Sequence, residues 1–222
     1  MDWLAGTWAV FRKDLRIELR NRYAVNSLLL FVLGALFLVL FAVGPQPLSA
    51  RVQSALLWIV MLFAASLGLG RSFVSEEEGG TALLLRLNTR ASTVFVGKFL
   101  FNLLLVAGLT VVAAGAFLLL LDIPIRSPGL LSAVLSLGTL GLASATTLLA
   151  ALVARAARRG PLLPVLLLPL LVPLLVSGTS ATRKAMNGRP WVQAQDELLT
   201  LVGFAGATLS ASIVLFDYVW EE

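Results

Sequence analysis

Long apolar runs alternate with short polar connections along most of the chain. Each run approaches the roughly 20 residues that an α-helix needs to cross a bilayer. The connections are short, so they leave no room for a soluble catalytic domain. We therefore predict an all-α polytopic membrane protein with a single transmembrane domain over residues 1–222 and six spans, near 26–43, 52–69, 99–121, 130–154, 162–176 and 198–218.

Residues 1–25 carry a different pattern, in which apolar and cationic side chains recur on separate faces of one helix. The apolar stripe consists of Leu4, Trp8, Phe11, Leu15 and Leu19, and the cationic stripe of Arg12, Arg16 and Arg20. Like charges at this spacing repel each other in an isolated helix. An anionic leaflet relieves that repulsion while the apolar stripe contacts acyl chains. We predict an amphipathic helix at the membrane interface; an acidic partner protein against the arginines is an alternative.

Positive charge is distributed unevenly between the two sets of loops. The chain carries 17 Lys and Arg residues and a net charge of +5. Most of these cations lie in 1–25, 70–98 and 155–159, which the predicted spans place on one side of the membrane. Because cytoplasmic loops are enriched in Lys and Arg, we expect both termini in the cytoplasm. Anionic lipid accounts for the basic composition, so no nucleic-acid partner is expected.

Composition excludes most kinds of enzyme site. The chain has no His and no Cys, which removes His-based triads, thiol nucleophiles, disulfides and Cys/His zinc sites. It contains no G-x-x-x-x-G-K-S/T motif, so it does not bind ATP through a P-loop. No charged residue is expected in the middle of a span, which disfavours an ion-coupled carrier. We expect no catalytic residue and no metal ligand, and hence a protein that is not an enzyme.

The connection over residues 70–98 has the most informative pattern. Ser75 and Glu78 have the spacing of a capping box, and the glycine pair at 79–80 interrupts any helix. Thr81 is suited to begin a short, leucine-rich helix. Such a helix is not stable alone in water, so its leucines need cover from this chain or from another subunit. The alternative for the glutamates is a solvated face.

This connection resembles the E-x-G-T signature of ABC-2 type exporter permeases, in the run Glu78-Gly79-Gly80-Thr81 followed by leucines. The whole chain is similar to the haem exporter protein B (CcmB) family of cytochrome c maturation. The other matching pieces are 42–45, 70–73 with the glutamates 76–78, 97–98, the proline- and leucine-rich fifth span and 216–219. A proline is expected in this family near residues 87–90 and is absent here, which leaves the end of the short helix open.

The resemblance implies an ABC-2 exporter-like permease whose short helix is a coupling helix that docks on a separate ATP-binding subunit. The coupling residues would be Glu76, Glu77, Glu78, Gly79, Gly80, Thr81, Leu83, Leu84, Leu85, Arg86 and Leu87. It also implies a homodimer in the bacterial inner membrane, with a CcmA-like ATPase that holds ATP and Mg²⁺. Further partners would be a Trp-rich haem-handling membrane protein (CcmC-like) and a small membrane subunit (CcmD-like).

Haem would be the cargo of that complex and not a cofactor of this chain, because the chain offers only three Met and two Tyr as axial ligands. Two other functions remain open. One is an ABC-2 permease for a lipid, glycan or drug. The other is a non-transporting membrane scaffold for a cytoplasmic ATPase. No substrate-contacting residue is predicted.

The fifth span is rich in proline. Each proline inside a helix removes a backbone hydrogen bond and favours a kink, so we expect a short, bent span that is either a static kink or a moving hinge. The prolines concerned are Pro161, Pro164, Pro169 and Pro173. The polar stretch 177–197 that follows is expected to be an outer-face loop, and the resemblance implies that it contains short helices.

Overall fold

The computed structural model describes residues 3–44, 48–69, 89–154 and 162–221. The all-α prediction is confirmed for these ranges, which contain no strand, and each of the six predicted spans falls in its own helix. The described residues form seven α-helices and one short 3-10 helix: α1 (Trp3–Asn21), α2 (Tyr23–Val43), α3 (Ala50–Leu69), α6 (Ala91–Leu120), α7 (Pro128–Ala154), α8 (Leu162–Met186), η1 (Trp191–Ala194) and α9 (Gln195–Glu221).

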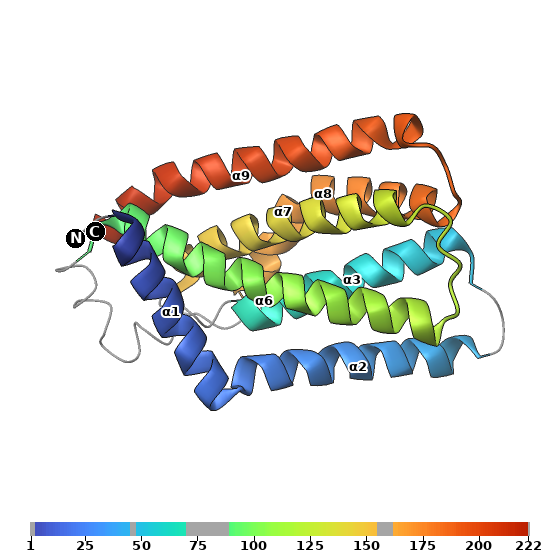
Figure 1. Cartoon of the computed structure of the whole chain (residues 1–222), viewed down its shortest axis with the longest axis horizontal. Coiled ribbons are helices and arrows are strands. Elements are labelled where there is room, and N and C mark those ends of the chain that lie inside the picture. The colour runs from blue at the N-terminus through green and yellow to red at the C-terminus, as the bar shows by residue number, and fades with distance from the viewer. Residues whose placement is uncertain (1–2, 45–47, 70–88, 155–161, 222) are drawn as a thin grey trace.

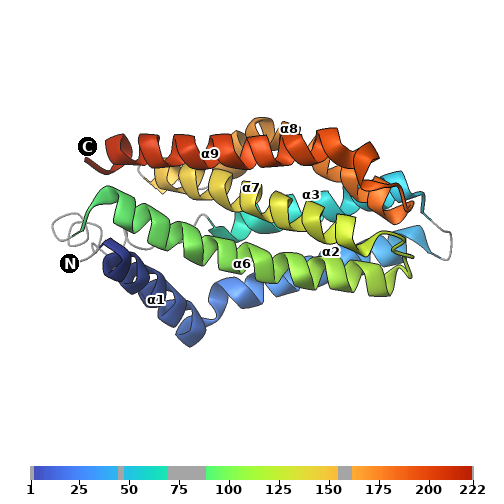
Figure 2. The ribbon, with the colours of Figure 1, turned by 45° about the horizontal axis from the view of Figure 1, so that its top comes forward.

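Six helices lie side by side along the long axis of the molecule, and α1 crosses one end of this bundle obliquely (Figures 1 and 2). α1 begins and α9 ends at that same end. Within the described ranges, five segments are long and apolar enough to cross a membrane, and α3 adds a shorter apolar helix over Ala50–Ser66. The five are Val25–Ala42, Ala91–Leu120, Pro128–Val153, Val165–Met186 and Trp191–Phe216.

A sharp bend between α1 and α2 sets the direction of α1. Arg22 lies at the bend with a left-handed φ of 50°, a conformation that ends a right-handed helix. The Oε1 atom of Glu18 accepts a hydrogen bond from the backbone N–H of Val25 at 2.9 Å. A side chain of α1 thereby caps the first turn of α2 and fixes the bend.

α7 is the central helix of the bundle. Every residue over 141–150 is buried, and α7 packs against α6, α8 and α9. Apolar burial gives little attraction between helices in lipid, so small residues and interhelical hydrogen bonds set the packing. Three such bonds reach α7 from α6 and α9: Thr110–Thr139 at 2.9 Å, Asn102–Thr147 at 2.9 Å and Ser144–Thr208 at 2.6 Å.

Trp58 of α3 is fully buried and joins three helices. Its indole Nε1 donates a hydrogen bond to Oγ1 of Thr182 in α8 at 2.9 Å. The ring lies directly against Gly138 of α7 and Gly178 of α8. A Cβ atom at these two positions would lie 2.1 and 2.6 Å from ring carbons, so only glycine leaves room for the indole.

Residues 177–186 continue α8, so the prediction of an outer-face loop over 177–197 is wrong for this part. Several of the polar side chains that suggested a loop contact neighbouring helices instead: Thr182 is fully buried against the indole, and Ser180 donates a hydrogen bond to Glu197 of α9. The connection to α9 is confined to 187–194, which includes the 3-10 turn Trp191–Ala194.

Two of the predicted hinge prolines, Pro169 and Pro173, lie inside α8. The helix runs for 25 residues, so the prediction of a short fifth span is also wrong. Both prolines are exposed, whereas Leu171 between them is fully buried. The missing backbone hydrogen bonds therefore fall on the side facing away from the bundle. Pro164 belongs to the first turn of α8, Pro161 lies outside the described residues, and a moving hinge stays a prediction.

Filling the space beside the Trp58 ring should destabilise the bundle. Gly138→Val forces the indole out of position, and overpacking of this kind costs about 1–3 kcal/mol. Gly108→Val in α6 is the matched control, because a Cβ at Gly108 meets nothing within 4 Å. We expect a lower thermal unfolding midpoint for Gly138→Val than for the control, measured in detergent by Trp fluorescence. Equal midpoints would contradict the packing described here.

Candidate functional site

The segment expected to couple with an ATP-binding subunit, residues 76–87, lies outside the described residues. Its flanks are described, since α3 ends at Leu69 and α6 begins at Ala91. The expectation that the connection extends to residue 98 is wrong, because 91–98 form the first turns of α6. α6 begins at the bundle end that α1 crosses (Figure 2), and the two helices pack against each other there.

Two glycines allow the backbones of α1 and α6 to approach closely. A Cβ on Gly6 would lie 2.9 Å from the Cγ2 atom of Thr93. A Cβ on Gly97 would lie 2.7 Å from the Cβ of Val10 and 2.9 Å from the carbonyl oxygen of Thr7. Glycine is thus required on each side of the seam, and α1 is packed against α6 instead of lying apart from the bundle.

A buried ion pair lies in this seam. The Nζ atom of Lys98 is 3.2 Å from Oδ2 of Asp14. The Lys98 side chain is 0% exposed and that of Asp14 is 7% exposed. Lys13 also contacts the same carboxylate, with its Nζ 3.4 Å from Oδ1. Because an unpaired charge is costly in such surroundings, the two helices are held in one register.

This ion pair corrects one expectation. Lys98 is not a loop cation, because it lies near the start of α6, within the apolar span Ala91–Leu120. The signal that points to the pair is on α1, where Asp14 shares a helical face with Thr7 and Val10. That face lies away from the arginine stripe and is buried, and a carboxylate there needs a cation from another element.

The other faces of α1 remain at the surface, and Trp8 stacks on Phe11 with ring centroids 5.1 Å apart. This combination of apolar and cationic surface suits a helix at a membrane interface, a role that stays a prediction. Of the residues predicted for it, Trp8, Arg12, Arg16, Leu19 and Arg20 are exposed, and Phe11 and Leu15 are half-buried.

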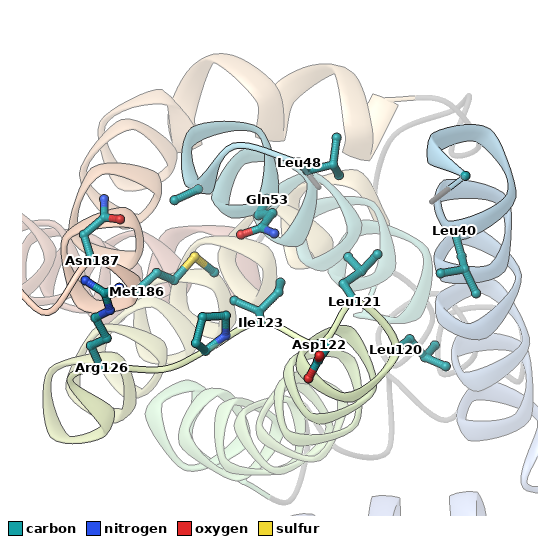
Figure 3. A pocket seen from close by; sticks show the side chains of 13 residues that line it. Leu40, Leu48, Gln53, Leu120, Leu121, Asp122, Ile123, Arg126, Met186 and Asn187 are labelled. Atoms are coloured by element: carbon teal, nitrogen blue, oxygen red, sulfur yellow. The ribbon is translucent and has the colours of Figure 1, made fainter. Parts of the chain in front are cut away.

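A cavity of about 600 Å³ opens at the opposite end of the bundle (Figure 3). The ends of α2, α3 and α8 form its walls together with the connection from α6 to α7. Gln53, Asp122, Arg126 and Asn187 supply polar groups, while Met186 and several leucines supply apolar ones. Such a lining suits an amphipathic small molecule. No sequence motif predicts the cavity, because its walls come from segments far apart in the chain.

The bundle of long apolar helices with an amphipathic α1 defines a polytopic helical membrane protein. A family profile described as CcmB protein matches residues 5–215. Heme exporter protein B of Rhodobacter capsulatus is 34% identical over 204 residues, which cover 91% of this chain and 92% of that protein. The protein of the same name from Pseudomonas aeruginosa is 30% identical over 202 residues, which cover 87% of this chain and 91% of that protein.

The chain therefore belongs to the CcmB family. Heme exporter protein B of Bradyrhizobium diazoefficiens is 34% identical over 183 residues, which cover 81% of this chain and 82% of that protein. The expected resemblance is thus confirmed over nearly the whole chain. Members of this family are transmembrane permease subunits, so the chain is not itself an enzyme.

Removing one partner of the buried ion pair should loosen the seam. Lys98→Met leaves the buried Asp14 carboxylate paired with the partly exposed Lys13, so the loss should be up to about the 3–5 kcal/mol that breaking a buried pair costs. The double variant Asp14→Leu/Lys98→Met should recover most of the loss, because two apolar side chains can replace a buried pair. Thermal unfolding in detergent measures both effects.

Arg51→Met is the control for this experiment, since Arg51 is an exposed cation on α3. We expect its unfolding midpoint to stay near that of the unmodified protein. A Lys98→Met midpoint equal to that of the control, or a double variant less stable than Lys98→Met alone, would show that the pair does not hold the seam.

Proposed function

We propose that the chain is the transmembrane permease subunit of an ABC transporter that handles haem for cytochrome c maturation in the bacterial inner membrane. The family match over residues 5–215 carries this proposal, together with relatives named heme exporter protein B that align along most of their length. The helical bundle supports a transmembrane role. A separate ATP-binding subunit would hydrolyse ATP, because the sequence has no P-loop motif.

The proposed complex contains two copies of this chain and two copies of a CcmA-like ATPase that binds ATP and Mg²⁺. A Trp-rich CcmC-like membrane protein would hold the haem iron, since this chain has no His or Cys to do so. A small CcmD-like membrane subunit completes the assembly. The uneven distribution of Lys and Arg supports cytoplasmic termini. That α1 begins and α9 ends at one end of the bundle supports an even number of crossings.

Residues 76–87 are proposed to dock on the ATPase and to transmit its closure to the bundle. This segment connects α3 to α6, so a force on it acts on both helices. α6 is joined to α1 by the buried ion pair and to α7 by two side-chain hydrogen bonds. α3 is joined to the proline-bearing α8 through the Trp58 indole. Movement of this segment would then reach α1 and α7 through α6, and α8 through α3.

Purification from the native membrane in a gentle detergent tests this assembly. We expect an ABC ATPase and a Trp-rich haem-handling protein to co-elute with the tagged chain, identified by mass spectrometry. An ATPase without haem proteins would favour a permease for a lipid, glycan or drug. Absence of any ATPase after mild crosslinking would contradict the proposed coupling.

The same purification tests the coupling residues when Leu84 is replaced by Glu. The added charge should prevent an apolar helix from docking, so the ATPase should be lost while the membrane partners stay. Leu84→Met is the matched control and should retain the ATPase. The thermal midpoint of the Leu84→Glu chain should be unchanged, and co-purification of the ATPase with this variant at the unmodified level would disprove the assignment.

Nucleotide-dependent motion separates a permease from a scaffold. The chain contains no native Cys, so Leu120→Cys/Asn187→Cys places spin labels on opposite sides of the cavity shown in Figure 3. Labelled chains diluted with unlabelled ones report the distance within one copy. In the complex with its ATPase, we expect this distance to change between ATP-bound and ADP-bound states. An unchanged distance would favour the scaffold.

A further inference from the structure

An apolar groove of about 340 Å³ lies in the angle between α1 and α6. Two aromatic side chains of α1 and four aliphatic side chains of α6 line it: Trp8, Phe11, Leu100, Leu103, Leu104 and Ala107. Trp8 is 59% exposed and Leu104 is 48% exposed, so the groove is open along its length. Along α6, the groove begins about one turn after Gly97. The two helices are in close contact at Gly97, and they diverge beyond it (Figures 1 and 2).

The volume and apolar lining of the groove favour a thin apolar occupant. A transmembrane helix is about 10–12 Å wide with its side chains, which is broad for a hollow of this volume. A single acyl chain is narrower and needs no hydrogen-bonding partner from the wall. The stacked rings of Trp8 and Phe11 form one rigid side of the groove.

The charges beside the groove favour an anionic headgroup. Arg12 follows Phe11 directly and lies one turn after Trp8, and Arg16 and Arg20 continue the same exposed stripe. The two carboxylates of α1 are already engaged, because Asp14 pairs with Lys98 and Glu18 accepts the N–H of Val25. The groove wall formed by α6 contributes no carboxylate. Among the described residues of α1 and of the groove wall, an anion above the groove therefore meets cations and no unengaged carboxylate.

We propose that this groove binds one acyl chain of an anionic phospholipid whose phosphate contacts Arg12 and Arg16. The lipid would fill the angle between α1 and α6. It would thereby support the oblique position of α1 independently of any transported cargo. This inference goes beyond the proposed transport function and does not depend on the identity of the cargo.

Native mass spectrometry of the purified, delipidated complex tests the proposal. The probes are phosphatidylglycerol and phosphatidylcholine with identical acyl chains. We expect one tightly retained phosphatidylglycerol per copy of this chain and at least tenfold weaker retention of phosphatidylcholine. Equal retention of the two lipids by the unmodified complex would overturn the charge argument.

Two variants fill the groove, namely Leu104→Trp and Ala107→Phe. Each should weaken retention of phosphatidylglycerol at least tenfold. Val111→Trp is the matched control, because Val111 lies on the same face of α6, is 73% exposed and is not part of the groove. It should bind the lipid as the unmodified chain does. Suppose that either groove-filling variant keeps the thermal midpoint of the unmodified chain. If that variant also binds phosphatidylglycerol as tightly as the unmodified chain does, the groove is not the lipid site.

The double variant Arg12→Gln/Arg16→Gln separates the headgroup from the acyl chain. It should abolish the preference for phosphatidylglycerol over phosphatidylcholine while retaining weak binding of both. Retention of the full preference would show that the phosphate lies elsewhere. If photocrosslinking from Trp8→photo-Leu captures a co-purified polypeptide and no lipid, the groove is a protein interface and the lipid proposal is wrong.

Discussion

The contact between Asp14 and Lys98 holds the amphipathic helix on the bundle. Two charges are taken out of water there, and each offsets part of the cost of burying the other. Glycine at positions 6 and 97 lets the helices come close enough for the charges to meet. The position of α1 and the groove beside it both depend on this contact. The chain enters α6 shortly after residues 76–87, the segment that the family resemblance assigns to coupling.

The rest of the bundle is held by small and polar groups that meet between apolar helices. Lipid surrounds the helices with a medium as apolar as their own side chains, so apolar contact alone does not specify a register. Hydroxyl and amide pairs provide that register around α7. The Trp58 indole provides it between α3 and α8, because its ring fits only over two glycines. These contacts explain why polar residues lie inside an otherwise apolar bundle.

The sequence predicted the helices well, because an apolar run of sufficient length has few other structures available in a membrane. It predicted contacts between distant segments poorly. Residues 177–186 were predicted to be a loop because they are polar. The sequence does not reveal that Thr182 bonds to Trp58, which is 124 positions away. Lys98 looked like a loop cation for the same reason. The cavity could not be predicted, since four separate elements form it. The coupling residues came only from the resemblance and lie outside the described ranges.

The separation of Asp14 and Lys98 by 84 residues has a consequence for biosynthesis. Chains are made from the N-terminus, so Asp14 leaves the ribosome long before its partner exists. Until α6 has entered the membrane, the carboxylate stays solvated and α1 has no fixed position on the bundle. Insertion of the third span is therefore the step that seats the first helix. A chain arrested before that point would leave the face of α1 that carries Thr7, Val10 and Asp14 without the helix that covers it.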